Sequence, residues 1–529
     1  KECFENSKGN AKKLNELHKR ITNLKIFDPA CGSGNFLIIA YKELRKLEMD
    51  IFKSGQMLNM PSIKLSQFYG IELDDFAHEV AILSLWLAEH QMNQEFKKLF
   101  GNCTPTLPLQ DSGNIVCGNA TRLDWEEVCP KNEGDEIYIL GNPPYLGFNV
   151  QTDEQKQDIY FVLPETDNHK FLDYIVCWFV LGAKYIKGTN FQLAFVTTNS
   201  IAQGTQVPIV WTRIFNMNLE IGFTYPEFIW SNNAKDKAGV ICSIISLRNV
   251  QNKSKYIFSQ NIRKKVENIN AYLANSQNII IEKRQKPLSN LPSMSTGNIP
   301  YDGGNLIISE EEKNELESNY PESIIFIKQL SGSKEYINNL TRYCLWIEEE
   351  NIQLAYSIPP IKERIEKVKI SRENGGKIAK NYANKPYRFY MTNRTKSFQI
   401  IIPRVSSIRR EYIPMGVLNN DVIISDSAQA IYDTEIYVLG VLNSRMHMIW
   451  VNLLAGRLKS DYRYSAVICY NTFPFPKITQ TQKEKIEELV NIILDERDKE
   501  YLKTLAELYD PNKMPDGLKK AHENLDLYI

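Results

Sequence analysis

Residues 27–48, FDPACGSGNFLIIAYKELRKLE, join an apolar segment that ends at Asp28 to a segment with helical periodicity. The apolar residues before Asp28 predict a buried β-strand, and those from about Asn35 onward predict a helix. Gly32 and Gly34 permit positive φ and close approach of a ligand to the backbone. The loop is therefore typical of a cofactor site at the carboxyl end of a strand. A tight strand-to-helix turn without a ligand is the alternative.

The segments around this loop alternate strands and helices. Over residues 24–247 the predicted strands are LKIFD, FYGIEL, NIVCGN, IYILGN, FQLAFVTTN, LEIGFTY and GVICSIISL, and the predicted helices include 75–93 and 169–187. Such alternation predicts a mostly parallel sheet with helices on both faces. Nearly continuous apolar strands fit burial on both sides of that sheet. We therefore expect a Rossmann-like α/β domain over residues 1–250.

Three further predicted strands end in polar residues. Glu72, with Leu73 beside it, has the spacing of a carboxylate that accepts both hydroxyls of a ribose. Asn119 and Ala120 follow the next strand, where they would meet an adenine ring, and NPPY (142–145) follows the fourth. Four strand ends that each carry a suitable polar residue are much harder to obtain by chance than one. Taken singly, Glu72 also fits a solvated acid and Asn119 a turn residue.

Length and composition limit the class of protein. A chain of 529 residues exceeds one compact core, which predicts two or three domains, and 43% hydrophobic with 24% charged residues is typical of globular proteins. The nine cysteines form no CxxC pair and the six histidines no HExxH motif, so we expect reduced thiols and no metal site. No apolar run reaches the ~18–20 residues of a membrane span, and no signal peptide is visible. We expect a cytoplasmic protein.

The pattern changes after residue 250. Residues 251–300 are rich in Lys, Asn and Ser and predict a connecting region. Residues 301–476 have short apolar stretches, Pro and Gly punctuation and many tyrosines, which favours an α+β domain. Residues 477–529 are charged and helical in pattern, with DPNKMPDG (510–517) predicted to break them into two pieces.

A basic region lies inside the 301–476 segment. Between Lys362 and Arg410 there are 14 Lys or Arg against 3 Glu and no Asp. The aromatic residues interleaved with them are Tyr382, Tyr387, Phe389, Tyr390 and Phe398. Basic residues with aromatic neighbours favour a phosphate-binding groove, and zero net charge does not exclude a local one. The alternative is a solvated basic face.

The segment GRLKSDYRYS (456–465) is a sharper candidate for recognition of DNA bases. Lys459 and Asp461 are two residues apart, so on an extended chain they point the same way. Lysine donates to guanine O6 and N7, and aspartate accepts from cytosine N4. We hypothesise that this pair recognises a G·C base pair, with Arg457 and Arg463 as further contacts. A local ion pair on a loop is the alternative.

These motifs together resemble the S-adenosylmethionine-dependent amino-methyltransferases of DNA. DPACGSGNF resembles their first motif and NPPY their catalytic motif for N6-adenine methylation, in the order of the gamma arrangement. More closely, FDPACGSGNFLIIAYKELRKLE, GRLKSDYRYS, YNTFPFP and LAELYDP…MP…LKKAH resemble the MmeI-like enzymes, which fuse nuclease, methyltransferase and target-recognition domains. The resemblance spans almost the whole chain.

The resemblance implies S-adenosylmethionine as cofactor and double-stranded DNA with a short recognition site as partner. Its cofactor-binding positions here are Asp28, Pro29, Ala30, Gly32, Gly34, Phe36, Glu72, Leu73, Asn119 and Ala120, and its catalytic positions are Asn142, Pro143, Pro144 and Tyr145. The family's YTP-type cofactor segment is missing from residues 1–23, and so is its nuclease. We therefore expect a chain that begins partway through a larger protein, with an N-terminal nuclease as a further partner in the same polypeptide.

The NPPY motif suits amino methylation. The exocyclic nitrogen of adenine is a poor nucleophile because its lone pair is delocalised into the ring. The Asn142 side-chain oxygen and the Pro143 carbonyl can accept its two protons, which favours a tetrahedral nitrogen. Tyr145 can stack on a base that has left the duplex. Phe228 and Trp230 are candidates for the second wall of the pocket, or are packing residues.

Two rival functions remain from the sequence. NPPY also occurs in enzymes that methylate glutamine in release factors and in RNA-modifying enzymes, but these lack a C-terminal recognition region of this size. The second rival is a DNA-binding specificity module whose methyltransferase is degenerate. The intact Asp28 and Asn142 argue against it. We expect a site-specific adenine-N6 DNA methyltransferase of a restriction–modification system.

Overall fold

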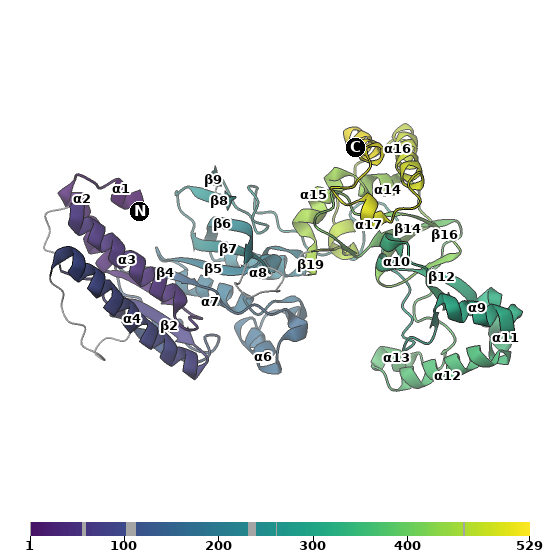
Figure 1. Ribbon diagram of the computed structural model, residues 1–529, viewed down its shortest axis with the longest axis horizontal. Helices are drawn as coiled ribbons and strands as arrows, with labels where there is room; N and C mark the ends of the chain where they lie inside the picture. Colours follow the sequence, from purple (N-terminus) through teal and green to yellow (C-terminus); the bar gives the residue numbers. More distant parts are fainter. Residues whose placement is uncertain (1, 55–59, 102–112, 231–239, 261, 459–460) are drawn as a thin grey trace. The chain divides into compact units, whose positions relative to one another are not determined.

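The computed structural model describes residues 2–54, 60–101, 113–230, 240–260, 262–458 and 461–529 (Figure 1). Lys459 of the predicted base-recognition pair and the side chain of Trp230 lie outside this description. The chain divides into two compact units, Lys1–Ile280 and Ile281–Ile529. Across the described residues, the structure contains no helix with the length and apolar character that a membrane span requires.

A central sheet organises the first unit. Within the described residues it has nine strands in the order β3-β2-β1-β4-β5-β7-β6-β8-β9. The strands are β1 (Leu24–Asp28), β2 (Phe68–Glu72), β3 (Asn114–Cys117), β4 (Glu136–Gly141), β5 (Gln192–Thr198), β6 (Leu219–Trp230), β7 (Val240–Asn249), β8 (Lys255–Ser259) and β9 (Ile262–Val266). The first five strands of this order, β3, β2, β1, β4 and β5, are parallel to their neighbours. β7 is antiparallel to both β5 and β6. The predicted strands and their mostly parallel arrangement are confirmed.

The strand order reverses beside β1. β2 pairs with one edge of β1 and β4 with the other, so the chain crosses over between them. Open α/β sheets bind ligands at the carboxyl ends of strands at such a reversal. Asp28 ends β1 and Gly141 ends β4 at this point, which places the loops that follow both strands at the expected ligand edge.

Helices cover both faces of the sheet, as predicted (Figure 1). Ile26 packs in one apolar cluster with Leu37 of α3 (Asn35–Ser54) and Leu85 of α4 (Asp75–Phe100). Its neighbour Phe27 points to the other face, where its ring lies 5.4 Å from Trp125 and 6.0 Å from Tyr185. The remaining helices of this unit are α1 (Glu2–Glu5), α2 (Ala11–Thr22), α5 (Trp125–Val128), α6 (Asp153–Val162), α7 (Val176–Ile186) and α8 (Val207–Asn216).

Two helix boundaries differ from the sequence prediction. α4 continues to Phe100 instead of 93 and ends at Gly101, whose φ of 84° a glycine adopts without strain. The helix predicted over 169–187 begins only at Val176, after a short 3₁₀ turn. The cause is local: the Asp173 carboxylate accepts hydrogen bonds from the N–H groups of Leu146 and Ile175, which fixes a turn before the helix.

The start of the predicted connecting region adds two strands to the sheet. β8 pairs in parallel with β6, and β9 pairs antiparallel with β8. The exposed positions of β9 include Arg263, Lys264 and Lys265. Charged residues on an edge strand discourage pairing with another chain.

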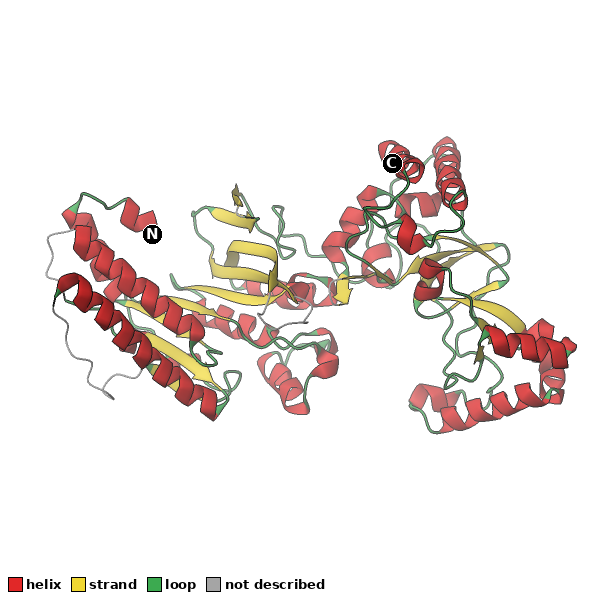
Figure 2. Cartoon of the chain, in the orientation of Figure 1, coloured by secondary structure: helices red, strands yellow, loops and turns green. Residues whose placement is uncertain are grey.

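The second unit combines small, mainly antiparallel sheets with helices, as expected for an α+β domain (Figure 2). Its sheets have the orders β10-β18-β14-β16, β11-β13-β12-β17 and β15-β20-β19. The strands are β10 (Met294–Thr296), β11 (Ile307–Ile308), β12 (Ile327–Ser331), β13 (Tyr343–Leu345), β14 (Phe398–Pro403), β15 (Val405–Ser406), β16 (Gly416–Asn419), β17 (Val422–Ile424), β18 (Ala428–Tyr432), β19 (Gly456–Leu458) and β20 (Asp461–Arg463). The helices before the tail are α9 (Glu310–Asn319), α10 (Ser333–Asn338), α11 (Ile352–Ser357), α12 (Pro359–Glu373), α13 (Lys377–Asn381), α14 (Tyr437–Leu442) and α15 (Arg445–Leu454).

The C-terminal tail is helical, as predicted. It contains α16 (Gln480–Asp498), α17 (Leu505–Leu508) and α18 (Asp516–Tyr528), so the break between the long helices is wider than residues 510–517. A buried polar cluster fixes the three helices: Arg497 Nε donates to the Tyr509 hydroxyl at 2.8 Å, which lies 2.7 Å from His522 Nε2. Burial lowers the pKa of His522 to about 3, so the ring is neutral and compatible with the adjacent guanidinium.

Candidate functional site

The loop after β1 is shaped by hydrogen bonds to two carboxylates. Asp28 Oδ1 accepts the N–H of Ala30 at 3.0 Å, and Glu72 Oε2 accepts the N–H of Gly32 at 2.7 Å. Gly32 and Gly34 have φ values of 54° and 82°, which side-chain-bearing residues rarely adopt. The two predicted glycines are therefore needed for this conformation. Phe36 is half-buried in the first turn of α3.

Asp28 keeps one carboxylate oxygen free. The residue is fully buried, and Oδ2 has no hydrogen-bond partner in the described part of the chain. Burial, opposed by the N–H of Ala30 and aided by the nearby Glu72, raises the pKa of Asp28 to about 7. A buried acceptor of this kind is costly unless a ligand or ion satisfies it. It therefore suits a cationic group.

Glu72 serves the loop and retains capacity for a ligand. Its two carboxylate oxygens accept the N–H groups of Gly32 and Asp74, the latter at 2.9 Å. Each oxygen has a second lone pair, so the half-buried carboxylate can still accept from hydroxyls. Leu73 beside it is 69% exposed.

Both ends of the Asn119 side chain are hydrogen-bonded within the protein. Its Oδ1 accepts from the N–H and hydroxyl of Thr121 at 2.9 and 2.8 Å, and its Nδ2 donates one of its two protons to Asp158 Oδ2 at 3.0 Å. This arrangement favours the turn role, because the protein's own bonds fix the orientation of the amide. Ala120 is buried, and its carbonyl accepts the indole N–H of Trp125 at 2.9 Å.

The loop after β4 presents an unpaired acceptor. Asn142 Oδ1 is buried and has no hydrogen-bond partner among the residues described. Pro143 is buried and Pro144 exposed. An acceptor in this position can take a proton of an amino group brought to it.

Tyr145 lies against β7. Its hydroxyl forms a hydrogen bond with the Cys242 thiol, and burial raises its pKa. Phe228 of β6 is the strand partner of Cys242, so its side chain lies on the same face of the sheet. This placement is compatible with Phe228 as a second wall of the pocket.

Strand pairing brings the two loops together. β1 and β4 are parallel, with Phe27 opposite Ile139. A Cβ added to Gly141 would lie 2.4 Å from Asp28 Oδ1. The carboxylate at the first loop therefore contacts the residue directly before Asn142. Gly141 was missed in the sequence, although its place before NPPY and the parallel pairing were available signals.

The predicted base-recognition segment forms a hairpin. Leu458 pairs with Asp461 and Arg457 with Tyr462. Asp461 and Arg463 share one face of β20, and Arg457 and Tyr462 share the other. The Arg457 guanidinium lies 4.2 Å from the Tyr462 ring centroid and donates to Asn452. These contacts give Arg457 a packing role.

The basic region offers less free charge than its composition indicates. Half of its 14 basic residues pair with carboxylates: Arg364–Glu312, Lys367–Glu363, Lys369–Glu373, Lys385–Glu349, Arg388–Glu349, Arg394–Glu348 and Arg409–Asp510. Arg372 is fully buried and donates to the carbonyls of Pro300, Tyr301, Tyr382, Lys385 and Arg388. It fixes the loop after α12 and has no surface to offer DNA.

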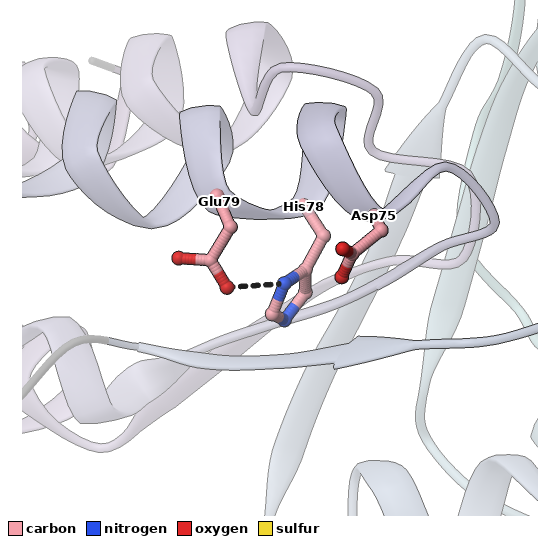
Figure 3. Close-up of side chains that lie close together, drawn as sticks. All are labelled: Asp75, His78 and Glu79. Atoms are coloured by element: carbon pink, nitrogen blue, oxygen red, sulfur yellow. Dashed lines mark ion pairs between the residues drawn. The ribbon is translucent and has the colours of Figure 1, made fainter.

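One small group of side chains has metal-ligand chemistry. Asp75, His78 and Glu79 lie at the start of α4 (Figure 3). His78 Nδ1 lies 3.2 Å from Glu79, and Nε2 lies 3.2 Å from the Ile115 carbonyl. An ion pair and a backbone hydrogen bond account for this arrangement, and we assign no metal to it.

Three protein-family models match the chain in succession. The MmeI DNA-methyltransferase domain matches residues 4–259, the MmeI target recognition domain residues 275–477, and the MmeI C-terminal domain residues 478–529. The chain belongs to the MmeI family. The resemblance to MmeI-like enzymes, drawn from FDPACGSGNFLIIAYKELRKLE, GRLKSDYRYS, YNTFPFP and LAELYDP…MP…LKKAH, is thus confirmed. Methyl transfer by such a domain needs a methyl donor.

Individual relatives and one solved structure are also similar to this chain. DNA methyltransferase A of Bacillus subtilis (strain 168) is 49% identical over 522 residues, which are 97% of this chain and 59% of that protein. The solved structure of the Type IIL restriction-modification enzyme MmeI in complex with DNA has a TM-score of 0.90 and 37% identity, covering 99% of this chain and 72% of that one. A type II restriction enzyme and methyltransferase of Escherichia coli is 25% identical over 207 residues, 32% of this chain and 20% of that protein. The chain thus spans less than two thirds of the length of its curated relatives.

Proposed function

We propose that this chain is the methyltransferase and target-recognition part of an MmeI-type restriction–modification enzyme. It transfers methyl from S-adenosylmethionine to adenine N6 in a short, specific site of double-stranded DNA, in the cytoplasm of a bacterium. The observation that carries this proposal is the unpaired Oδ1 of Asn142 beside the glycine loop of β1.

The chain's four parts have separate tasks in this proposal. Residues 1–250 hold the methyl donor and perform the transfer. Residues 251–300 first add β8 and β9 to the sheet and then connect the two units, 301–476 recognise DNA, and 477–529 form a helical support. The family-model boundaries at 259, 275 and 477 support a division close to this one.

The residues after β1 and β2 fit S-adenosylmethionine. The free Oδ2 of Asp28 suits a cationic part of the cofactor, and Glu72 suits the ribose hydroxyls. The glycine loop lets the backbone approach the ligand. Bound there, the cofactor supplies a methyl group activated by its sulfonium.

The NPPY loop activates the acceptor nitrogen. Asn142 Oδ1 and the Pro143 carbonyl accept the two amino protons, which localises the lone pair on the nitrogen and favours the positive charge that develops there. Tyr145 and Phe228 hold the flipped base between rings. The rest of the rate enhancement comes from positioning the methyl group and the amino nitrogen in line.

The first test is incubation of the chain with S-adenosylmethionine and mixed-sequence bacterial DNA, followed by single-molecule sequencing for modified bases. We expect N6-methyladenine at one short motif. Methylation of protein or RNA in place of DNA would favour the rival methyltransferase classes. DNA binding with no methylated product would count against methyl transfer and leave only target recognition, whereas loss of both DNA and cofactor binding would remove the proposal entirely.

The affinity for S-adenosylmethionine is expected to rise about tenfold between pH 6 and pH 8. The pKa of Asp28 is raised to about 7 by burial, so at pH 6 the free protein carries mainly the neutral acid, which offers no charge to a cation. Binding favours the carboxylate and therefore releases a proton below pH 7. Calorimetric titration at four pH values measures the slope.

The control for this pH dependence is Asp28→Asn. The asparagine keeps an oxygen that accepts the N–H of Ala30, but it does not titrate. Any change of affinity with pH that remains in this variant therefore belongs to the cofactor's own amino group. Equal slopes in the two proteins would show that Asp28 does not meet a cationic group.

The hairpin β19–β20 supports recognition of a G·C pair. Asp461 lies on one face of β20 and is half-buried. We expect that Lys459→Glu with Asp461→Arg changes the methylated motif at one position, because a well-placed base contact contributes roughly 1–3 kcal/mol of discrimination. Sequencing of the methylated sites gives the motif.

Arg457→Lys is the matched variant for this experiment. Arg457 belongs to the same hairpin but faces Tyr462 and Asn452, so its replacement leaves the motif unchanged. If the double variant at 459 and 461 still methylates the original motif, Lys459 and Asp461 do not recognise a base pair, and the alternative of a local ion pair holds.

A further inference from the structure

The segment Asp173–Trp178 contacts the loops after three different strands. It includes the turn before α7 and the first residues of that helix. The indole Nε1 of Trp178 donates to the carbonyl of Pro29 at 3.0 Å, and both residues of this bond lie away from solvent. Trp178 therefore holds the glycine loop that follows β1. We call the segment Asp173–Trp178 the α7 clamp.

The α7 clamp also holds the catalytic loop. Leu146, the residue after NPPY, donates its N–H to Asp173 Oδ1 at 2.9 Å. Its carbonyl accepts the N–H of Tyr174 at 3.0 Å and the side-chain amide of Gln151 at 2.7 Å. Both backbone groups of Leu146 are thus fixed by side chains or backbone of neighbouring elements.

The third contact runs through a buried carboxylate. The Tyr174 hydroxyl donates to Asp158 Oδ2 at 2.7 Å, and the same oxygen accepts from Asn119. Asp158 Oδ1 accepts from Arg122 Nε at 2.7 Å. Burial alone would raise the pKa of Asp158, but the hydrogen bonds from Asn119, Tyr174 and Arg122 outweigh it and lower that pKa. The ionised Asp158 thereby ties the loop after β3 to Tyr174.

These contacts have a common pattern. Trp178 and Asp173 bond to the backbone of the loops, and Tyr174 reaches Asn119 through one carboxylate. Tyr174 and Trp178 also pack edge to face, with ring centroids 5.2 Å apart. The three loops therefore share one rigid, buried support, whereas loops without such a support are mobile.

We propose that the α7 clamp is a positioning element that sets the distance between the glycine loop and Asn142. Tyr174 and Trp178 are positioning residues: they act through Asp158 and Pro29 and do not touch a reactant. The proposal rests on the proposed function, because methyl transfer in line is sensitive to small changes in the separation of its reactants.

Two conservative variants test the clamp, and each removes one hydrogen bond. Tyr174→Phe removes the hydroxyl bonded to Asp158, and Trp178→Phe removes the N–H bonded to Pro29. Tyr185→Phe is the matched control on α7, since the buried Tyr185 hydroxyl donates to the Cys129 carbonyl at 2.6 Å, away from the three loops. Trp211→Phe is the second control, with an indole N–H that donates to the Ile201 carbonyl at 2.8 Å.

The first readout is hydrogen–deuterium exchange of the chain without ligands. Among the three loops, Trp178→Phe removes a hydrogen bond only from the glycine loop, yet the proposal predicts faster exchange in peptides covering 142–147 as well. Tyr174→Phe is expected to accelerate exchange in 117–123 and 142–147. The two controls are expected to leave all these peptides at the rate of the unaltered chain. If exchange becomes faster only in the loop that lost its hydrogen bond, the proposal is overturned.

The second readout separates turnover from binding. We expect kcat at saturating DNA and cofactor to fall on the order of tenfold in Tyr174→Phe and Trp178→Phe, with KM for the cofactor changed less than about threefold. An unchanged kcat despite faster exchange, or an equal fall in the controls, would reduce the clamp to a structural support. If the unaltered chain transfers no methyl group, the proposed function fails, and the exchange measurement still decides whether the loops are coupled.

Discussion

Asn142→Ala is expected to lower the rate of adenine methylation by about 10²–10³-fold, the usual effect of removing one preorganised polar group from a catalytic site. Asn142 Oδ1 is buried at the end of β4 and lacks a partner within the described chain. Its removal leaves one amino proton of the adenine without an acceptor, and the nitrogen lone pair stays delocalised. No hydrogen bond of the free protein is lost, so the melting temperature is expected to stay within a few degrees of the unaltered chain.

The measurement is single-turnover methyl transfer to DNA, with cofactor affinity measured on the same samples. Asn149→Ala is the control, because Asn149 is an exposed amide a few residues further along the same loop. The control is expected to keep its rate. A rate in Asn142→Ala within threefold of the unaltered chain would mean that the NPPY loop does not perform the transfer. A large loss of cofactor affinity would place Asn142 in binding instead.

The sequence predicted the sheet edge that carries the site. Each apolar strand ended in a residue whose chemistry was visible locally: Asp28 with its glycines, Glu72 and Asn142. Because parallel strands end at one edge of a sheet, periodicity and strand order were sufficient to group them. The structure adds that Asp28 Oδ2 and Asn142 Oδ1 are unpaired, which a linear sequence does not state.

The residues that support the site were not predictable from local patterns. Asp158, Tyr174 and Trp178 lie 16 to 149 positions from the residues they bind, and each resembles an ordinary helix or core residue. Their roles depend on how α6 and α7 pack beneath the loops. Asn119 is the converse case: its side chain has the chemistry of a ligand contact, but it is bonded to Thr121 and Asp158.

Composition was also a limited guide in the second unit. The basic count over 362–410 indicated a charged groove, but charge pairs form with acidic residues that lie outside that window, such as Glu312, Glu348 and Glu349. Arg457 was grouped with Asp461 by proximity in the sequence, whereas the hairpin register separates their faces. Net charge available to a ligand depends on these pairings, and they follow from tertiary structure.

Gly141→Ala is expected to abolish measurable cofactor binding and to lower the free energy of unfolding by about 1–3 kcal/mol, the usual cost of overpacking a buried site. The added Cβ would lie 2.4 Å from Asp28 Oδ1 and 3.1 Å from its carboxylate carbon. Asp28 is fully buried and held by the N–H of Ala30, so it moves only by losing that hydrogen bond or by shifting β1 against β4. Either change displaces the glycine loop relative to Asn142.

Gly147→Ala is the matched variant, because it lies in the same loop and its added Cβ meets no atom within 4 Å. Both glycines have ordinary negative φ, so neither replacement imposes strain on the backbone, and the comparison isolates the contact with Asp28. Thermal unfolding and calorimetric titration of S-adenosylmethionine are measured on both proteins. A second-site change, Asp28→Ala in the Gly141→Ala background, is expected to recover stability because the clash is gone, without recovering affinity. Equal affinity in Gly141→Ala and Gly147→Ala would show that the position of the Asp28 carboxylate does not matter for the cofactor, and the assignment of Asp28 would fail with it.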